Sequence, residues 1–144
     1  KDMNSFNKSD IMALLQSVFA PWVQDLKLQV TEINNKDVQF YLPENDNLVR
    51  SGGDGPPVIC GQAIASAADT CCVLALTAIN KKFRNCTTVD MTNHFMRPLS
   101  NTGIEISVEI LSNGRKMAVL RANFKNKSGK LAATAICSFA YLDT

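Results

Sequence analysis

The longest apolar stretch of the chain covers residues 58–80, and its hydrophobic residues would lie on nearly every side of a helix. Pro56 and Pro57 precede it, and proline is tolerated best in the first turn of a helix. Lys81 and Lys82 follow it, where positive charge suits the helix dipole. The pattern predicts a helix over residues 59–79, and a helix that is apolar on every side must be buried.

Shorter segments on both sides of this helix show other periodicities. Residues 10–19 have apolar positions at helical spacing, with Ser9 or Asp10 as the expected cap and Pro21 as the stop. Apolar and polar residues alternate in two segments before the long helix, residues 26–31 and 38–42, which the turn signal Asn34-Asn35 separates. Four strand-like segments follow the long helix, at residues 86–97, 103–111, 115–125 and 130–142, with Asn113-Gly114 as the strongest hairpin turn.

One long helix among hairpin strands predicts an α+β fold, in which an antiparallel sheet wraps around the helix. The 144 residues fit one domain, with an N-terminal helical segment at residues 1–24 and a core at residues 25–144. A transmembrane span is an alternative for the helix because its length suffices. Asp69 in mid-span argues against that alternative, since a carboxylate is costly in lipid, so no membrane partner is expected.

Composition narrows the function further. The net charge of +2, with no run of basic residues, does not indicate nucleic-acid binding. None of the five cysteines forms a Cys-x-x-Cys pair, and Cys71 and Cys72 fall inside the predicted helix. This pattern predicts reduced thiols in a cytoplasmic protein. The first residues show no basic stretch followed by an apolar run, so no signal peptide is expected within them.

Four motifs then stand in a fixed order along residues 38–142. Gly61 lies eight residues before Asp69, which belongs to S-A-A-D-T, and T-T-V-D-M-T-N-H-F-M-R-P follows at residues 87–98. N-G-R stands at residues 113–115 and S-G-K-L-A-A-T-A at residues 128–135. Together they resemble the hotdog-fold acyl-CoA thioesterases of the phenylacetate-pathway (PaaI-like) type. The helix and the F-x-R-P strand in this order carry most of the resemblance.

The resemblance implies hydrolysis of an acyl-CoA to a free acid and coenzyme A, with no cofactor beyond the coenzyme A of the substrate. It implies that Asp69 acts as general base or nucleophile and that the Gly61 amide polarises the thioester carbonyl. It also implies a homodimer or a homotetramer built from two dimers, in which a hydroxyl of the partner subunit orients the water. Thr87 and Thr88 fall near the position of that hydroxyl.

The same residues have simple physical readings beside the implied ones. Helix N-terminal N–H groups can receive the negative charge that builds on a thioester oxygen. Burying an unpaired carboxylate costs free energy, so the presence of Asp69 in a mostly apolar helix favours a functional role. The structural alternatives are an Asp69 bonded to a neighbouring strand, a Gly61 that only eases helix packing, and Thr87 and Thr88 as plain strand formers.

Several residues are predicted to contact the substrate. The family often has His-Gly-Gly at the helix start, whereas this chain has Cys60-Gly61-Gln62, where the Gln62 side-chain amide offers a substitute hydrogen bond. Asp54 stands nearest to the position of a substrate-positioning Asn in the family. The remaining candidates are polar or basic residues expected near the substrate and the coenzyme A: Asn93, Arg97, Asn126, Lys127, Ser128 and Lys130.

Two other functions remain open from the sequence. Cys60, His94 and Asp69 supply the residue types of a thiol-based catalytic triad. A non-catalytic module of the same fold, binding acyl-CoA or acyl carrier protein, would also account for the missing histidine. A metal site is not expected, because the chain has one histidine and no spacing typical of metal ligands.

Overall fold

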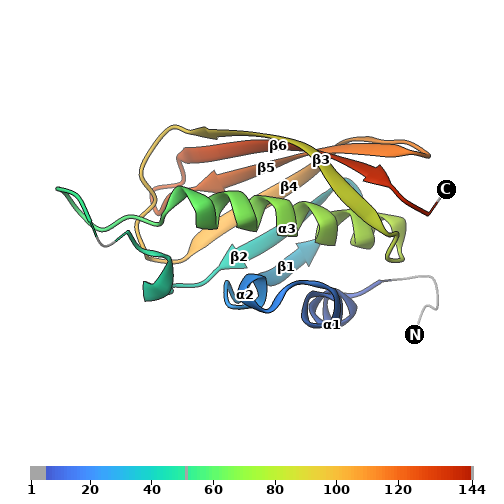
Figure 1. Cartoon of the computed structure of the whole chain (residues 1–144), viewed down its shortest axis with the longest axis horizontal. Coiled ribbons are helices and arrows are strands. Elements are labelled where there is room, and N and C mark those ends of the chain that lie inside the picture. The colour runs from blue at the N-terminus through green and yellow to red at the C-terminus, as the bar shows by residue number, and fades with distance from the viewer. Residues whose placement is uncertain (1–5, 51, 144) are drawn as a thin grey trace.

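The computed structural model describes residues 6–50 and 52–143, and at its centre the long helix α3 (Gly61–Asn80) lies against a six-stranded antiparallel sheet (Figure 1). The sheet order is β1-β2-β4-β5-β6-β3. The strands are β1 (Gln29–Ile33), β2 (Asp37–Leu42), β3 (Cys86–Phe95), β4 (Ile104–Asn113), β5 (Met117–Lys125) and β6 (Leu131–Tyr141). This confirms the predicted α+β fold with an antiparallel sheet around one long helix.

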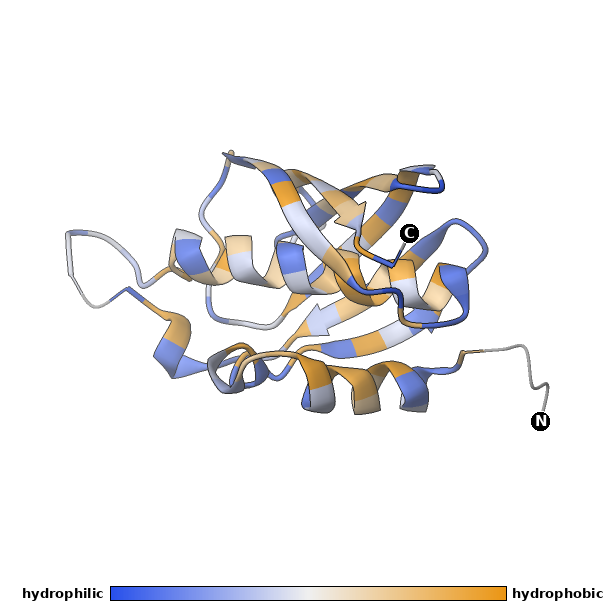
Figure 2. Cartoon of the chain, turned by 45° about the vertical axis from the view of Figure 1, so that its right-hand side comes forward, coloured by the Kyte–Doolittle hydropathy of each residue, from blue (hydrophilic) through white to orange (hydrophobic). Residues whose placement is uncertain are grey.

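Helix α3 is enclosed by the rest of the domain. It contacts strands β2 to β6 on one side and the N-terminal helices α1 (Lys8–Val18) and α2 (Pro21–Gln24) on another. Figure 2 shows its ribbon pale or orange along most of its length, between the strands above and α1 below. By length and composition α3 could cross a membrane, but 67% of its most apolar window is buried inside the domain. The helix therefore forms the core of the fold.

Small side chains let α3 lie close to the sheet. Ala67, Ala68 and Ala75 are completely buried. Large apolar residues of the sheet, among them Phe124 and Phe139, are also completely buried and belong to the same core. Close packing of this kind makes core substitutions costly, about 3–5 kcal/mol for Phe→Ala.

The start of α3 differs from the prediction. The helix begins at Gly61 rather than at residue 59, and Pro56 and Pro57 lie in the preceding loop. Ile59 is held extended because it forms a β-bridge with Val49 and its N–H donates to the Leu99 carbonyl at 2.8 Å. Tertiary hydrogen bonds thus shorten a helix that propensity alone would extend.

The starts of α1 and β1 also differ from the predicted ones. Neither Ser9 nor Asp10 is the N-cap of α1; Asn7 is, and it exchanges hydrogen bonds with Asp10 in a capping box. Strand β1 starts at Gln29 rather than at residue 26, because Lys27 has a left-handed φ of 56° at the end of the turn that follows α2. The short 3₁₀ helix η1 (Asp46–Leu48) follows β2.

Strand β3 forms one edge of the sheet and positions the candidate site. It pairs only with β6, so one row of its backbone groups is left without a strand partner in the described chain. The register shifts between Thr88 and Asp90, so Val89 is an extra bulge residue. The strand ends at Phe95 rather than at residue 97, because the N–H groups of Met96 and Arg97 both donate to the Ala132 carbonyl.

Candidate active site

Asp69 is hydrogen-bonded to the edge strand. The Thr88 hydroxyl on β3 donates to Asp69 Oδ1 at 2.7 Å. Thr88 is paired with Phe139, whose side chain is completely buried, so Thr88 lies on the face of the sheet that is turned toward α3. The pair holds one carboxylate oxygen in a fixed orientation.

The face of α3 that carries Asp69 is the one that the sheet leaves partly open. Ala65, Ser66, Asp69 and Val73 are partly exposed, whereas most of their neighbours on α3 are buried. Residues spaced three and four apart lie on one side of a helix. A carboxylate on this side is accessible to a reactant while the rest of the helix stays in the core.

Of the two candidate threonines, only Thr88 reaches Asp69. Thr87 pairs with Ala140, and because side chains alternate along a strand it points to the opposite face of the sheet. Thr87 therefore does not contact Asp69 of its own chain, and its place in the site stays a prediction. A hydroxyl that contacts Asp69 is supplied by the same chain, where the resemblance implied the partner subunit.

Gly61 lies at the other end of this helix face. It is the first residue of α3, after the N-cap Cys60, whose side chain makes no capping hydrogen bond. The N–H groups of a first helical turn have no partner within the helix. The Phe95 ring lies over Gly61, and a Cβ added there would be 3.6 Å from that ring. Free amides thus meet an aromatic surface at the start of α3.

A cleft of about 350 Å³ opens at Gly61. Phe95, Met96 and Arg97 line one part of it, and Arg50 lines another. The Arg97 guanidinium also donates to the Leu131 carbonyl at 2.6 Å, which fixes its direction. The cleft therefore combines apolar and aromatic walls with two cations.

Phe95 and Arg50 were not among the predicted site residues. Phe95 belongs to the F-M-R-P motif, which could have indicated it. Arg50 gives no sequence signal, because its place depends on the bridge between Val49 and Ile59 and on its own N–H donating to the Val58 carbonyl at 3.0 Å. Only the folded loop brings Arg50 to the helix start.

Of the other residues predicted at the helix start, Cys60 and Gln62 lie there and Asp54 does not. Cys60 is partly buried, and Gln62 is exposed, with no side-chain hydrogen bond among the described residues. Asp54 lies in a separate hollow of about 190 Å³ formed by its own loop, not in the cleft at Gly61. The match of Asp54 to a substrate-positioning residue therefore has no support within this chain.

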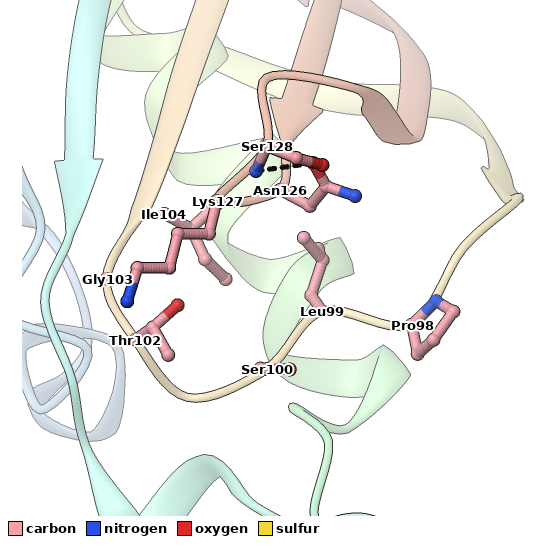
Figure 3. A pocket seen from close by; sticks show the side chains of 9 residues that line it. All are labelled: Pro98, Leu99, Ser100, Thr102, Gly103, Ile104, Asn126, Lys127 and Ser128. Carbon is pink, nitrogen blue, oxygen red and sulfur yellow. Dashed lines mark hydrogen bonds between the residues drawn. The ribbon is translucent and has the colours of Figure 1, made fainter.

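Ser128 lines a second cavity, of about 400 Å³, together with Asn126 and Lys127 (Figure 3). The Ser128 hydroxyl donates to Asn126 Oδ1 at 2.8 Å, and the backbone N–H of Lys130 donates to the same oxygen at 2.9 Å. Lys130 itself does not line this cavity. Asn126 thus organises the turn between β5 and β6.

The two cavities are neighbours. Pro98 and Leu99, in the connection from β3 to β4, line both of them. An extended ligand could pass from the cavity at Lys127 over this connection to the cleft at Gly61.

The thiol triad is not assembled in this chain. His94 pairs with Thr134 and, by strand alternation, points away from α3, whereas Asp69 is bonded to Thr88. Two of the buried cysteines are poor nucleophiles: desolvation raises the pKa of Cys71, and a hydrogen bond with Cys137 together with burial raises that of Cys72. Thiols with raised pKa values stay protonated at neutral pH.

Comparisons with known proteins show the family to which this chain belongs. Residues 58–133 match the model of the thioesterase superfamily. A Saccharolobus solfataricus protein whose name proposes esterase activity is 28% identical over 119 residues, covering 83% of this chain and 81% of that protein.

Solved structures share the fold. A thioesterase from Haemophilus influenzae superposes with a TM-score of 0.82 at 14% identity, over 96% of this chain and 92% of that one. The zebrafish thioesterase superfamily member 2 superposes with a TM-score of 0.77 at 20% identity, over 95% and 98%. The family match covers more than half of the chain and includes both Gly61 and Asp69, so this protein belongs to the thioesterase superfamily and has its hotdog fold.

Proposed function

We propose that this protein is an acyl-CoA thioesterase of the PaaI-like type, which hydrolyses a thioester to a free acid and coenzyme A. The observation that carries the proposal is the Thr88–Asp69 hydrogen bond, which holds a carboxylate on the open side of an otherwise buried helix. Membership of the thioesterase superfamily supports thioester hydrolysis in general.

In this mechanism the thioester carbonyl binds at the N–H groups of the first turn of α3, next to Gly61. The helix dipole favours the negative charge that develops on the carbonyl oxygen. Asp69 either takes a proton from water, whose oxygen then attacks the carbonyl carbon, or attacks that carbon directly. The C–S bond breaks, the coenzyme A thiolate leaves, and water supplies the proton and hydroxyl that complete the two products.

Gly61 and Asp69 of one chain are too far apart to act on one thioester. Eight residues of α-helix span about 12 Å. We therefore propose that each site combines Asp69 and Thr88 of one subunit with Gly61 of another. The exposed edge of β3 supports this pairing, because Val89 and Phe95 are 56% and 53% exposed on a strand with one row of backbone groups that no other strand of the described chain pairs. The assembly is a homodimer, or a homotetramer of two such dimers.

We infer the register of that pairing from the faces of β3. Thr88 lies near Asp69 and Phe95 near Gly61, so β3 runs antiparallel to α3. A two-fold axis at Thr92 would set Phe95 opposite the bulge at Val89 of the partner subunit. This brings the Gly61 end of one subunit next to the Asp69 of the other. On the outer face of β3, which is turned away from α3, the same axis sets His94 opposite Asp90 of the partner subunit.

A charge substitution on the outer face of β3 is expected to weaken the dimer. His94→Glu would place two carboxylates opposite each other twice per dimer, and like charges directly across strands are destabilising. We expect the dimer dissociation constant to rise about tenfold, measured by analytical ultracentrifugation. The double variant Asp90→Lys with His94→Glu restores opposite charges and should recover the dimer. A chain that is monomeric at micromolar concentration, or a double variant weaker than the single one, would refute this register.

We propose that coenzyme A binds along the two neighbouring cavities. Its phosphates are anionic, and Arg50, Arg97 and Lys127 supply positive charge along the route over Pro98. The five free thiols support our further proposal of a reducing, cytoplasmic setting.

The test of the function is a free-thiol release assay with a panel of aliphatic and aryl acyl-CoA substrates. Release of coenzyme A with at least one member is the expected result. Tight binding of acyl-CoA without release of thiol would instead identify a non-catalytic binding module.

Replacing Cys60 should change little. Its side chain makes no capping hydrogen bond, and a backbone amide donor survives a side-chain substitution. We expect Cys60→Ala to keep most of its turnover in the thiol-release assay. Loss of turnover in Cys60→Ala, together with inactivation of the wild type by iodoacetamide that substrate prevents, would move the chemistry to this thiol.

A further inference from the structure

Asn93 carries a buried acceptor that nothing in the described chain uses. Its side-chain Oδ1 is inaccessible to solvent and has no hydrogen-bond partner among residues 6–50 and 52–143. Folded proteins pair nearly all of their buried polar atoms, because an unpaired one costs free energy. Because the unpaired Oδ1 of Asn93 destabilises the fold, we expect a hydrogen-bond donor from outside the chain to pair with it.

The position of Asn93 places this acceptor beside the candidate site. Asn93 pairs with Ala135, which is buried, so its side chain lies on the face of β3 turned toward α3. Phe95, two residues further on the same face, covers Gly61. Residues two apart in a strand are about 7 Å apart. The Asn93 amide therefore lies between the Thr88 and Phe95 contacts with α3, nearer to the one at Gly61.

The residues around Asn93 on β3 and β6 are apolar. On the same face of β3 its neighbours are Met91 and Phe95, and across the pair lie Ala135 and Cys137 of β6. On α3 the open side carries the small residues Ala65 and Ser66, which are partly exposed. An acyl group that extends from the Gly61 amides along this side would pass the Asn93 amide.

We propose that Asn93 binds the acyl group of the substrate and makes the enzyme prefer acyl chains that carry a hydroxyl several bonds from the thioester. This inference rests on the proposed thioesterase function and adds its substrate class. A hydroxyl both donates and accepts a hydrogen bond, so it satisfies the Asn93 amide in either orientation of its oxygen and nitrogen. A plain alkyl chain would leave the acceptor unpaired, and sites that hydrogen-bond a substrate group discriminate strongly against analogues without it.

The test compares matched substrates on matched variants. Butanoyl-, hexanoyl- and octanoyl-CoA are paired with their terminally hydroxylated counterparts, and kcat/KM is measured for wild type, Asn93→Leu and the control Asn35→Leu. Asn35 is exposed in the turn between β1 and β2, at the opposite edge of the sheet from β3. We expect the wild type and Asn35→Leu to prefer one hydroxylated chain at least about tenfold, and Asn93→Leu to prefer the plain chain.

Two further measurements separate this inference from the proposed function. Thioether analogues of the same pairs cannot be hydrolysed, so their dissociation constants report the preference even if turnover is absent. The melting temperature of Asn93→Leu should rise above that of the wild type, because the substitution removes an unpaired buried acceptor. The role of Asn93 would be overturned if wild type and Asn93→Leu showed the same preference for the hydroxylated over the plain chain, in kcat/KM or in the dissociation constants of the analogues. The thioesterase function would still stand.

Discussion

Asp69→Asn is expected to lower kcat about 10²-fold or more and to leave KM nearly unchanged, because the amide can neither accept a proton from water nor attack the thioester. The fold should persist, since an asparagine Oδ1 can still accept the hydrogen bond that the Thr88 hydroxyl now donates at 2.7 Å. The measurement is release of coenzyme A under saturating substrate.

A matched control separates chemistry from general charge effects. Glu32→Gln removes an exposed carboxylate on β1, at the opposite edge of the sheet from β3, and should leave kcat unchanged. Near-normal turnover in Asp69→Asn would remove Asp69 from the mechanism and return it to the structural role of an acid bonded to a neighbouring strand.

Gly61→Val should also inactivate the enzyme. A mixed dimer of one Gly61→Val chain and one Asp69→Asn chain should recover activity. The valine side chain would occupy the space where the acyl carbon must approach the first-turn amides. Gly61→Ala is the folding control, because its Cβ would make ordinary contact with the Phe95 ring at 3.6 Å. In a mixed dimer of the two dead variants, one site holds both substitutions and the other holds neither.

The mixed dimer is obtained by co-expression with two different affinity tags and purification over both. We expect it to show about half of the wild-type activity per dimer, because one of its two symmetry-related sites is intact. Each variant purified alone stays inactive. A mixed dimer as inactive as its parents would show that Gly61 and Asp69 act within one chain, and would refute the composite site.

The helices and strands of this fold were predictable from the periodicity of apolar and polar residues along the chain. The alternation in residues 103–111 gave β4 and the apolar run gave α3, because burial on one face or on every side constrains each residue type. Boundaries were less predictable. The start of α3 moved by two residues because the bridge between Val49 and Ile59, which is a tertiary contact, competes with helix propensity.

The site was predictable in its residue types and not in its geometry. Asp69 and Gly61 stood out because a carboxylate and a glycine are unusual in an apolar helix. Which of Thr87 and Thr88 faces α3 depends on the register of β3 with β6, and the sequence carries no signal for it. Asn93 was named as a substrate contact, but the unpaired state of its Oδ1 became visible only once the side chain was packed.

The strand order has a consequence for how this protein is made. Strand β3 is synthesised before β4, β5 and β6, yet it pairs only with β6, and Cys86 finds its partner in Tyr141 near the end of the described chain. On the ribosome Asp69 and Thr88 therefore emerge early but cannot be held together until the last strand has left the exit tunnel. A premature stop codon before β6 would keep Gly61, Asp69 and Thr88 in the product and still abolish the catalytic arrangement.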